Sequence, residues 1–280
     1  MSNICTNPNS SLVCQPPVAS SPTETPGDAS SVEMEWDPAQ ALRQLTILFE
    51  PGQLFEIRIP EAVAKSMPKS APVTASGVFS SAISAVNSLE TILSMYTCTG
   101  IFFTLNPLDP SRVQPTNRIV AGPGKTPGDK DVLERRWLLV DCDPVRTKGT
   151  NSSQAELEHA LKTCEGIRTW LSANGFPEPV ELLSGNGGHL LYRVELSAAD
   201  TDLVRRFLTA LAVRFDDQYV KVDTSVANAS RLGKVAGTLT RKGEHTAERP
   251  RRISRLLGEA NTNAGFTPQV VSRKAIESIL

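Results

Sequence analysis

The stretch RWLLVDCD, residues 136–143, decides the fold class of this chain. It is an apolar run of strand length that ends in acid and is closed by Pro144. Ser153 and Glu156 then form a capping box, which predicts the start of a helix, and Asp200 opens a second helix with apolar residues at helical spacing. Further strands are predicted at 180–184, 189–196 and 219–223. This succession predicts an α/β fold of the α+β kind, in which helices pack against a mixed sheet.

The region before this stretch predicts a second set of elements. Asp37 is placed to cap a helix that has Pro38 at its first position. Residues 54–60 alternate like a strand, residues 77–95 have apolar side chains at helical spacing, and residues 100–105 form a short apolar strand candidate. The amino-terminal half is therefore also expected to contain helices and strands.

The length of 280 residues suits about two domains, or one large α/β domain with an appendage. Hydrophobic residues make up 40% and charged residues 21%, values typical of globular proteins, which exclude collagen-like, coiled-coil and wholly disordered chains. Residues 1–31 contain seven Ser and five Pro and no periodic apolar pattern, so residues 1–35 are predicted to be a flexible tail.

The sequence carries no sign of a membrane or secreted protein. No apolar stretch approaches the roughly 18 residues that cross a bilayer, and the start has neither a basic nor an apolar signal region. The five Cys are odd in number and form no C-x-x-C motif, which argues against a disulfide framework and a zinc knuckle. We expect a cytoplasmic protein with no membrane partner.

Asp141 and Asp143 are the first candidate site residues. Because successive side chains of a strand point to opposite faces, the two carboxylates share one face and Cys142 lies behind them. Adjacent carboxylates repel unless a cation lies between them, and such oxygen ligands favour Mg²⁺ or Mn²⁺. The alternative is a pair of exposed acids at a strand end.

Asp223 closes the strand 219–223 in the same manner, with Val220 and Val222 facing the other way. A third carboxylate is what a centre with two metal ions needs to orient an in-line attack on phosphorus. Taken alone, Asp223 is equally well explained as a turn residue.

The second candidate element is a glycine-rich turn that runs into His189. Three glycines leave backbone N–H groups free to approach a polyanion, and the imidazole could donate to a triphosphate oxygen or protonate a leaving pyrophosphate. The alternative is a hairpin turn with an incidental His. The turn consists of Ser184, Gly185, Asn186, Gly187 and Gly188.

The third element is a basic segment in a chain whose net charge is −1. Eight Lys and Arg lie between Arg231 and Arg255, against two acids. Arg231, Lys234 and Lys242 would neutralise a triphosphate held nearby, although a solvated basic turn would have the same composition.

In this order, the acidic pair, the glycine turn with His, the third Asp and the basic segment resemble the archaeo-eukaryotic primase superfamily, above all its phage and plasmid primase-polymerase domains. The resemblance spans roughly residues 36–257. It rests on RRWLLVDCDPVR (135–146), LLSGNGGHLLYRV (182–194) and VDTSVANASRLGKVAGTLTRKG (222–243), with TGIFFTLNPLDP (99–110) and FEIRIP (55–60) upstream.

The resemblance implies roles for the same residues. Asp141, Asp143 and Asp223 would hold two catalytic Mg²⁺ or Mn²⁺ ions, and His189 would contact the phosphates of the incoming nucleotide. Ser184 and the glycine turn would lie beside it, with Arg231, Lys234 and Lys242 as supporting cations.

The resemblance also implies a domain plan and partners. An amino-terminal α/β unit would cover residues 36–130, an RRM-like unit with the metal site residues 131–258, and an extension or linker residues 259–280. The reaction would be nucleotidyl transfer by a DNA primase or primase-polymerase in phage- or plasmid-type replication. NTP or dNTP would be the substrate and single-stranded DNA the template, and a replicative helicase is a candidate partner.

Two other functions remain open at this level. A nucleotide-sugar glycosyltransferase also places D-x-D after an apolar strand, to hold Mn²⁺, but gives no role to the glycine turn or the basic segment. A non-catalytic replication module would bind nucleic acid or nucleotide through a relic of the site.

Overall fold

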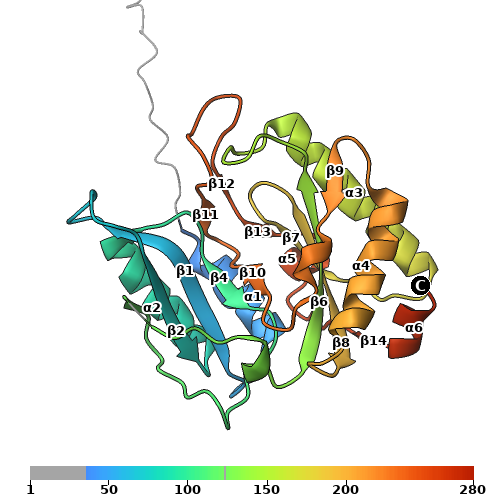
Figure 1. Cartoon of the computed structure of the whole chain (residues 1–280), viewed down its shortest axis with the longest axis horizontal. Helices are drawn as coiled ribbons and strands as arrows, with labels where there is room; N and C mark the ends of the chain where they lie inside the picture. The colour runs from blue at the N-terminus through green and yellow to red at the C-terminus, as the bar shows by residue number, and fades with distance from the viewer. Residues whose placement is uncertain (1–35, 123) are drawn as a thin grey trace, which may run out of the picture. The chain divides into compact units, whose positions relative to one another are not determined.

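The strand that contains Asp141 is the centre of a βαββαβ unit (Figure 1). The sheet order is β7-β8-β6-β9 with antiparallel neighbours, the order of ferredoxin-like and RRM-like units. The predicted α/β class with an RRM-like unit is therefore confirmed. Its elements are β6 (Arg135–Pro144), α3 (Gln154–Ala173), β7 (Val180–Leu183), β8 (Gly188–Leu196), α4 (Thr201–Phe215) and β9 (Val220–Val222).

This computed structural model describes residues 36–122 and 124–280, and the predicted flexible tail, residues 1–35, lies outside them. In the part of the chain it describes, no helix is both long and apolar enough to cross a membrane.

Helices α3 and α4 cover one face of this sheet. The capping box is present, because Ser153 Oγ accepts from Glu156 N at 3.2 Å and the Glu156 carboxylate accepts from Ser153 N at 2.8 Å. The apolar stripe of α3 is buried, and its Cys164 packs so close to Gly188 that a Cβ there would lie 2.6 Å from the sulfur. The helices thus close the face of Cys142 and leave the opposite face for the acids.

The amino-terminal half forms a second sheet of order β10-β4-β1-β2-β5, with β3 paired to β1; strand β10 (Leu232–Lys234) comes from later in the chain. Helices α1 and α2 supply apolar residues that are buried with the inner face of this sheet. Figure 1 shows this half on the left, in blue to green. Its elements are α1 (Pro38–Leu48), β1 (Phe55–Ala64), β2 (Val73–Phe79), α2 (Ala82–Met95), β3 (Tyr96–Thr97), β4 (Phe102–Thr104), β5 (Val120–Ala121) and the 3₁₀ turn η1 (Asp129–Asp131).

One predicted element in this half is wrong at its start. The helix expected over 77–95 begins at Ala82, after Ser81, whose Oγ accepts from Ser84 N. Val73–Phe79 is instead strand β2, which pairs antiparallel with β1 from Phe55 onward. The helical spacing of Val78 with the following apolar residues was misleading, because pairing with β1 overrides local periodicity.

Helix α1 and strand β10 (Leu232–Lys234) join the two halves. The Gln44 side chain donates to Lys234 O at 3.0 Å and accepts from Ala236 N at 2.7 Å, and Trp137 Nε1 donates to Leu48 O at 3.0 Å. Strand β10 lies beyond the predicted boundary at residue 130 but pairs with β4 in the amino-terminal sheet. The segment after β9 therefore returns to the first sheet and brings the basic residues to the junction.

The remaining elements lie after β9. Strand β13 pairs with β7 and β14 pairs in parallel with β8, so residues 259–280 add a strand to the sheet that contains β6. Apart from β10, the elements after β9 are the 3₁₀ turn η2 (Thr224–Ala227), β11 (Leu239–Thr240), β12 (Arg252–Ile253), β13 (Arg255–Leu256), α5 (Gly258–Thr262), β14 (Val270–Val271) and α6 (Arg273–Glu277).

Candidate active site

Two neighbouring strands, β6 and β8, bring the first two acids and the histidine together. Asp141 pairs with His189 across β6 and β8, and His189 Nε2 lies 3.4 Å from Asp141 Oδ1. Asp143 lies two residues further along the same face, near the end of β6. The side chains of Asp141 and His189 are 12% and 9% exposed, whereas the Asp143 side chain is 40% exposed. The acidic pair therefore runs from the buried interior of the sheet out to solvent.

The two acids differ in electrostatic surroundings. Burial raises the pKa of Asp141, but His189, Arg231 and Lys242 outweigh it and hold that pKa below its ordinary value. Burial, followed by the charge of Asp141, raises the pKa of Asp143. The pKa values of two adjacent acids separate in this way because the charge of the first carboxylate disfavours ionisation of the second.

The backbone of the third acid, Asp223, is hydrogen-bonded to that of Asp141, but its carboxylate contacts Ser225 and Arg231. Its N–H donates to Asp141 O at 2.9 Å. Its Oδ1 accepts from Ser225 N at 2.8 Å and caps η2, while Oδ2 lies 3.6 Å from the guanidinium of Arg231. Within residues 36–122 and 124–280, no group of three or more His, Cys, Asp and Glu is arranged to hold a metal ion.

Asp141 and Asp143 by themselves have the character of a cation site. Asp141 Oδ1 is buried and accepts no hydrogen bond from any described residue. Apart from the 3.4 Å contact with His189 Nε2, this buried carboxylate oxygen has no polar partner among the described residues, and a hard divalent cation bound by both carboxylates would satisfy it. The chemistry of these two donors suits a hard divalent cation such as Mg²⁺ or Mn²⁺, while the Asp223 carboxylate is engaged by Ser225 and Arg231.

The glycine-rich turn is buried between two neighbouring segments. Gly185 has φ +103°, and a Cβ there would lie 2.5 Å from Thr240 Oγ1. A Cβ at Gly187 would clash with the carbonyl oxygen of Cys142. The turn is also closed on itself, because Gly187 N donates to Ser184 Oγ at 3.2 Å and Ser184 Oγ donates to Gly187 O at 3.1 Å. Gly185 and Gly187 therefore allow close packing of the backbone, a role that their sequence pattern did not predict.

Asn186 anchors this turn. It is 4% exposed, and its Oδ1 accepts from Ser152 N at 2.7 Å. Gly188, the last residue of the turn, packs against α3 through Cys164. Residues 185–188 are buried, so their contact with a nucleotide stays a prediction.

The three predicted cations are placed differently. Arg231 lies beside Asp223, and Lys242 is exposed on the loop that follows β11, where its charge acts on both Asp141 and Asp143. Lys234 is buried, with Nζ 5.3 Å from the centre of the Phe102 ring and no hydrogen-bond partner among the described residues. Burial, together with Lys242 and Arg241, lowers the pKa of Lys234 to about 7. Arg231 and Lys242 thus lie with the acids, whereas Lys234 is enclosed.

Two groups at the site were not predicted. Arg146 Nη1 lies 3.7 Å from Asp143 Oδ1. Its position three residues after that acid could have indicated this contact from the sequence. Asn151 donates hydrogen bonds to two backbone carbonyls of the loop that carries Lys242. No periodicity or motif in the sequence points to Asn151.

No protein-family model matches the chain, and no curated protein matches it. Among solved structures, the chain is similar to the crystal structure of primase RepB′, with 14% identity and a TM-score of 0.44 over 86% of this chain. It is also similar to the catalytic domain of primase RepB′ in complex with initiator DNA, with 14% identity and a TM-score of 0.41 over 86% of this chain. The chain spans 61% of the length of the first and 93% of the second.

Proposed function

We propose that this protein is a metal-dependent nucleotidyltransferase, a DNA primase or primase-polymerase that joins nucleotides on a single-stranded DNA template. The observation that carries the proposal is the pair Asp141 and Asp143 at the end of β6, facing His189 and within range of the charges of Arg231 and Lys242. Acids that can hold a cation beside groups that attract a polyanion are the requirements of nucleotidyl transfer.

Asp141 and Asp143 would hold a divalent ion, with Asp223 joining them after it turns from Ser225 and Arg231. When bound, such an ion lowers the pKa of an attacking hydroxyl and offsets triphosphate charge. We assign two further tasks to the chain itself. Lys242, Arg231 and Arg146 neutralise the triphosphate and orient it, and the imidazole of His189 donates a hydrogen bond to a phosphate oxygen.

The buried glycine turn supports this arrangement indirectly. Because Gly187 allows the turn to pack on the Cys142 carbonyl, β8 starts in register with the acids and His189 faces Asp141. In this proposal the turn fixes the imidazole, and the cations on the following segment bind the phosphates.

The experiment is a product analysis with single-stranded DNA template, NTPs or dNTPs, and Mg²⁺ or Mn²⁺, with and without a supplied primer. We expect template-dependent products that disappear in chelator. Hydrolysis of a UDP-sugar without nucleotide incorporation would instead identify a glycosyltransferase. Binding of DNA or nucleotide that survives chelator and yields no product would identify a non-catalytic module.

A further inference from the structure

The loop that carries Lys242 has little secondary structure of its own. Strands β11 and β12 are joined by only two register pairs, Leu239 with Ile253 and Thr240 with Arg252. Residues 242 and 244–248 of the intervening loop are exposed. A two-stranded hairpin of this size is marginal in water, so contacts outside the hairpin must fix the loop.

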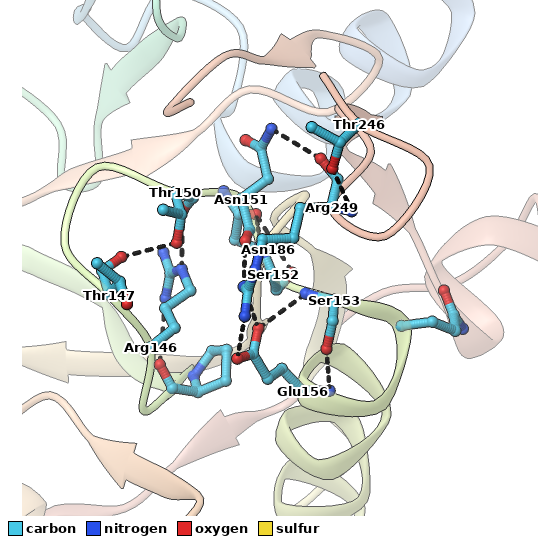
Figure 2. A network of polar contacts seen from close by, with 12 residues as sticks. Arg146, Thr147, Thr150, Asn151, Ser152, Ser153, Glu156, Asn186, Thr246 and Arg249 are labelled. Atoms are coloured by element: carbon cyan, nitrogen blue, oxygen red, sulfur yellow. Dashed lines mark hydrogen bonds and ion pairs between the residues drawn. The ribbon is translucent and has the colours of Figure 1, made fainter. Parts of the chain in front are cut away.

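Asn151 supplies two of these contacts from the segment between β6 and α3 (Figure 2), in addition to the hydrogen bond from Arg241 N to Thr99 O at 2.9 Å. It is 1% exposed, and its Nδ2 donates to Glu244 O at 2.9 Å and to Arg249 O at 3.2 Å. The backbone approaches as well, since a Cβ at Gly243 would lie 2.7 Å from Gly149 O. One buried amide therefore holds both ends of the exposed loop.

An ion pair adds a second connection (Figure 2). Arg249 Nη1 and Nη2 lie 2.7 and 2.9 Å from the two carboxylate oxygens of Glu156, and Arg249 Nη1 also donates to Asn151 O at 2.7 Å. Glu156 is itself fixed by the capping box of α3, the helix that packs behind the acids. Bidentate geometry of this kind restricts orientation as well as distance.

The same junction reaches the glycine turn. Arg252 Nη1 donates to Ser152 O at 2.8 Å, and Ser152 N donates to Asn186 Oδ1 at 2.7 Å. Thr240, two residues before Lys242, donates from Oγ1 to Ser184 O at 2.9 Å. The loop is thus tied to the start of α3 and to the turn that fixes His189.

We propose that Asn151, assisted by the Arg249–Glu156 ion pair, is a positioning residue that holds Lys242 where it meets the phosphates of a bound nucleoside triphosphate. The inference rests on the proposed function and adds to it the contacts that fix the position of Lys242. A lysine has many rotamers, so a fixed backbone at residues 243 and 244 restricts the region that its ammonium group can reach.

The test is a double-mutant cycle with Asn151→Ala and Lys242→Ala. The readouts are equilibrium Kd for a nonhydrolysable nucleoside triphosphate and, separately, KM and kcat for incorporation. We expect each single variant to weaken binding by about 10-fold, the usual size for loss of a charged contact, mainly through Kd and KM. The double variant should bind no more weakly than Lys242→Ala, because Asn151 acts through that lysine.

A structural role unconnected with Lys242 would make the two losses multiply, and this result would overturn the proposal. So would an Asn151→Ala variant that binds like the wild type. Absence of triphosphate binding by the wild type would instead overturn the proposed function as well, so the two failures are distinguishable.

Arg249→Ala provides a second variant if Asn151→Ala does not fold. Its matched control is Arg168→Ala, since Arg168 is also 32% exposed and forms an ion pair, with Glu178 at 3.0 Å. We expect Arg249→Ala to weaken triphosphate binding several-fold and to lose this effect in the Lys242→Ala background. Arg168→Ala should leave binding unchanged, and equal losses in the two variants would contradict a positioning role.

Discussion

The acidic and basic sides of the candidate site are built in different ways. Asp141 and Asp143 lie on β6, which pairs with β8 on one side and β9 on the other. Lys242 follows β11, which pairs with β12 at only two positions. The loop that carries Lys242 is held by side-chain hydrogen bonds from Asn151 and Arg249. The backbone ladder thus fixes the acids, whereas tertiary contacts fix the cation, and changes on the two sides should have different consequences.

The largest effect is expected on the acidic side, from Asp141→Asn. The substitution keeps shape but removes the charge, so we expect nucleotide incorporation to fall by about 10³-fold or more while the fold is retained. Single-turnover incorporation and thermal unfolding measure the two quantities. Asp202→Asn, at an acid in the first turn of α4, is the control. An Asp141→Asn variant that still polymerises would remove the acids from the mechanism.

Gly187→Ala tests the close packing of the glycine-rich turn on the backbone of Cys142. The added Cβ meets the Cys142 carbonyl, which is backbone, so we expect a loss of about 3 kcal/mol in the free energy of unfolding. Gly128 is the control, because its φ is −125° and a Cβ there meets nothing within 4 Å. Urea denaturation compares the two, and equal stability would show that the turn is not tightly packed.

Lys234→Met should stabilise the protein by about 2 kcal/mol at pH 6, because it removes a buried ammonium group that has no hydrogen-bond partner among the described residues. The pKa of Lys234 falls from 10.5 to about 7 on folding, so the unfolded state binds more protons between these values. Wild-type stability in this window therefore rises with pH, and the advantage of the variant shrinks. Urea denaturation at pH 6 and pH 9.5 measures the difference. A constant advantage would contradict the low pKa.

Asp223→Asn distinguishes the two tasks of the third acid. Asn also caps helical turns, so the contact with Ser225 N should survive and stability should change by less than about 1 kcal/mol. Loss of the charge should lower incorporation by about 10-fold. Incorporation at the wild-type rate would leave Asp223 with capping alone.

The same contrast explains what the sequence could predict. The alternation in β6 placed Asp141 and Asp143 on one face with Cys142 behind, and the capping box located α3, because both features are local. Residues 73–79 were missed as a strand, since their pairing partner lies in β1.

The burial of Lys234 and the contacts of Asn151 were also beyond prediction. Both depend on segments far apart in the sequence: Phe102 for Lys234, and residues 243–249 for Asn151. The placement of the two acids on one face of β6 could be predicted from local pattern, but the contacts that fix the loop of Lys242 could not.

Metal binding in the absence of turnover tests the central claim most directly. Calorimetric titration of Mn²⁺ into the wild type, Asp143→Asn and Asp202→Asn should give saturable binding that Asp143→Asn weakens by about 10-fold or more. Asp202→Asn should bind like the wild type. Equal Mn²⁺ binding by all three proteins, or none by the wild type even with a nucleoside triphosphate present, would contradict a catalytic centre at the end of β6.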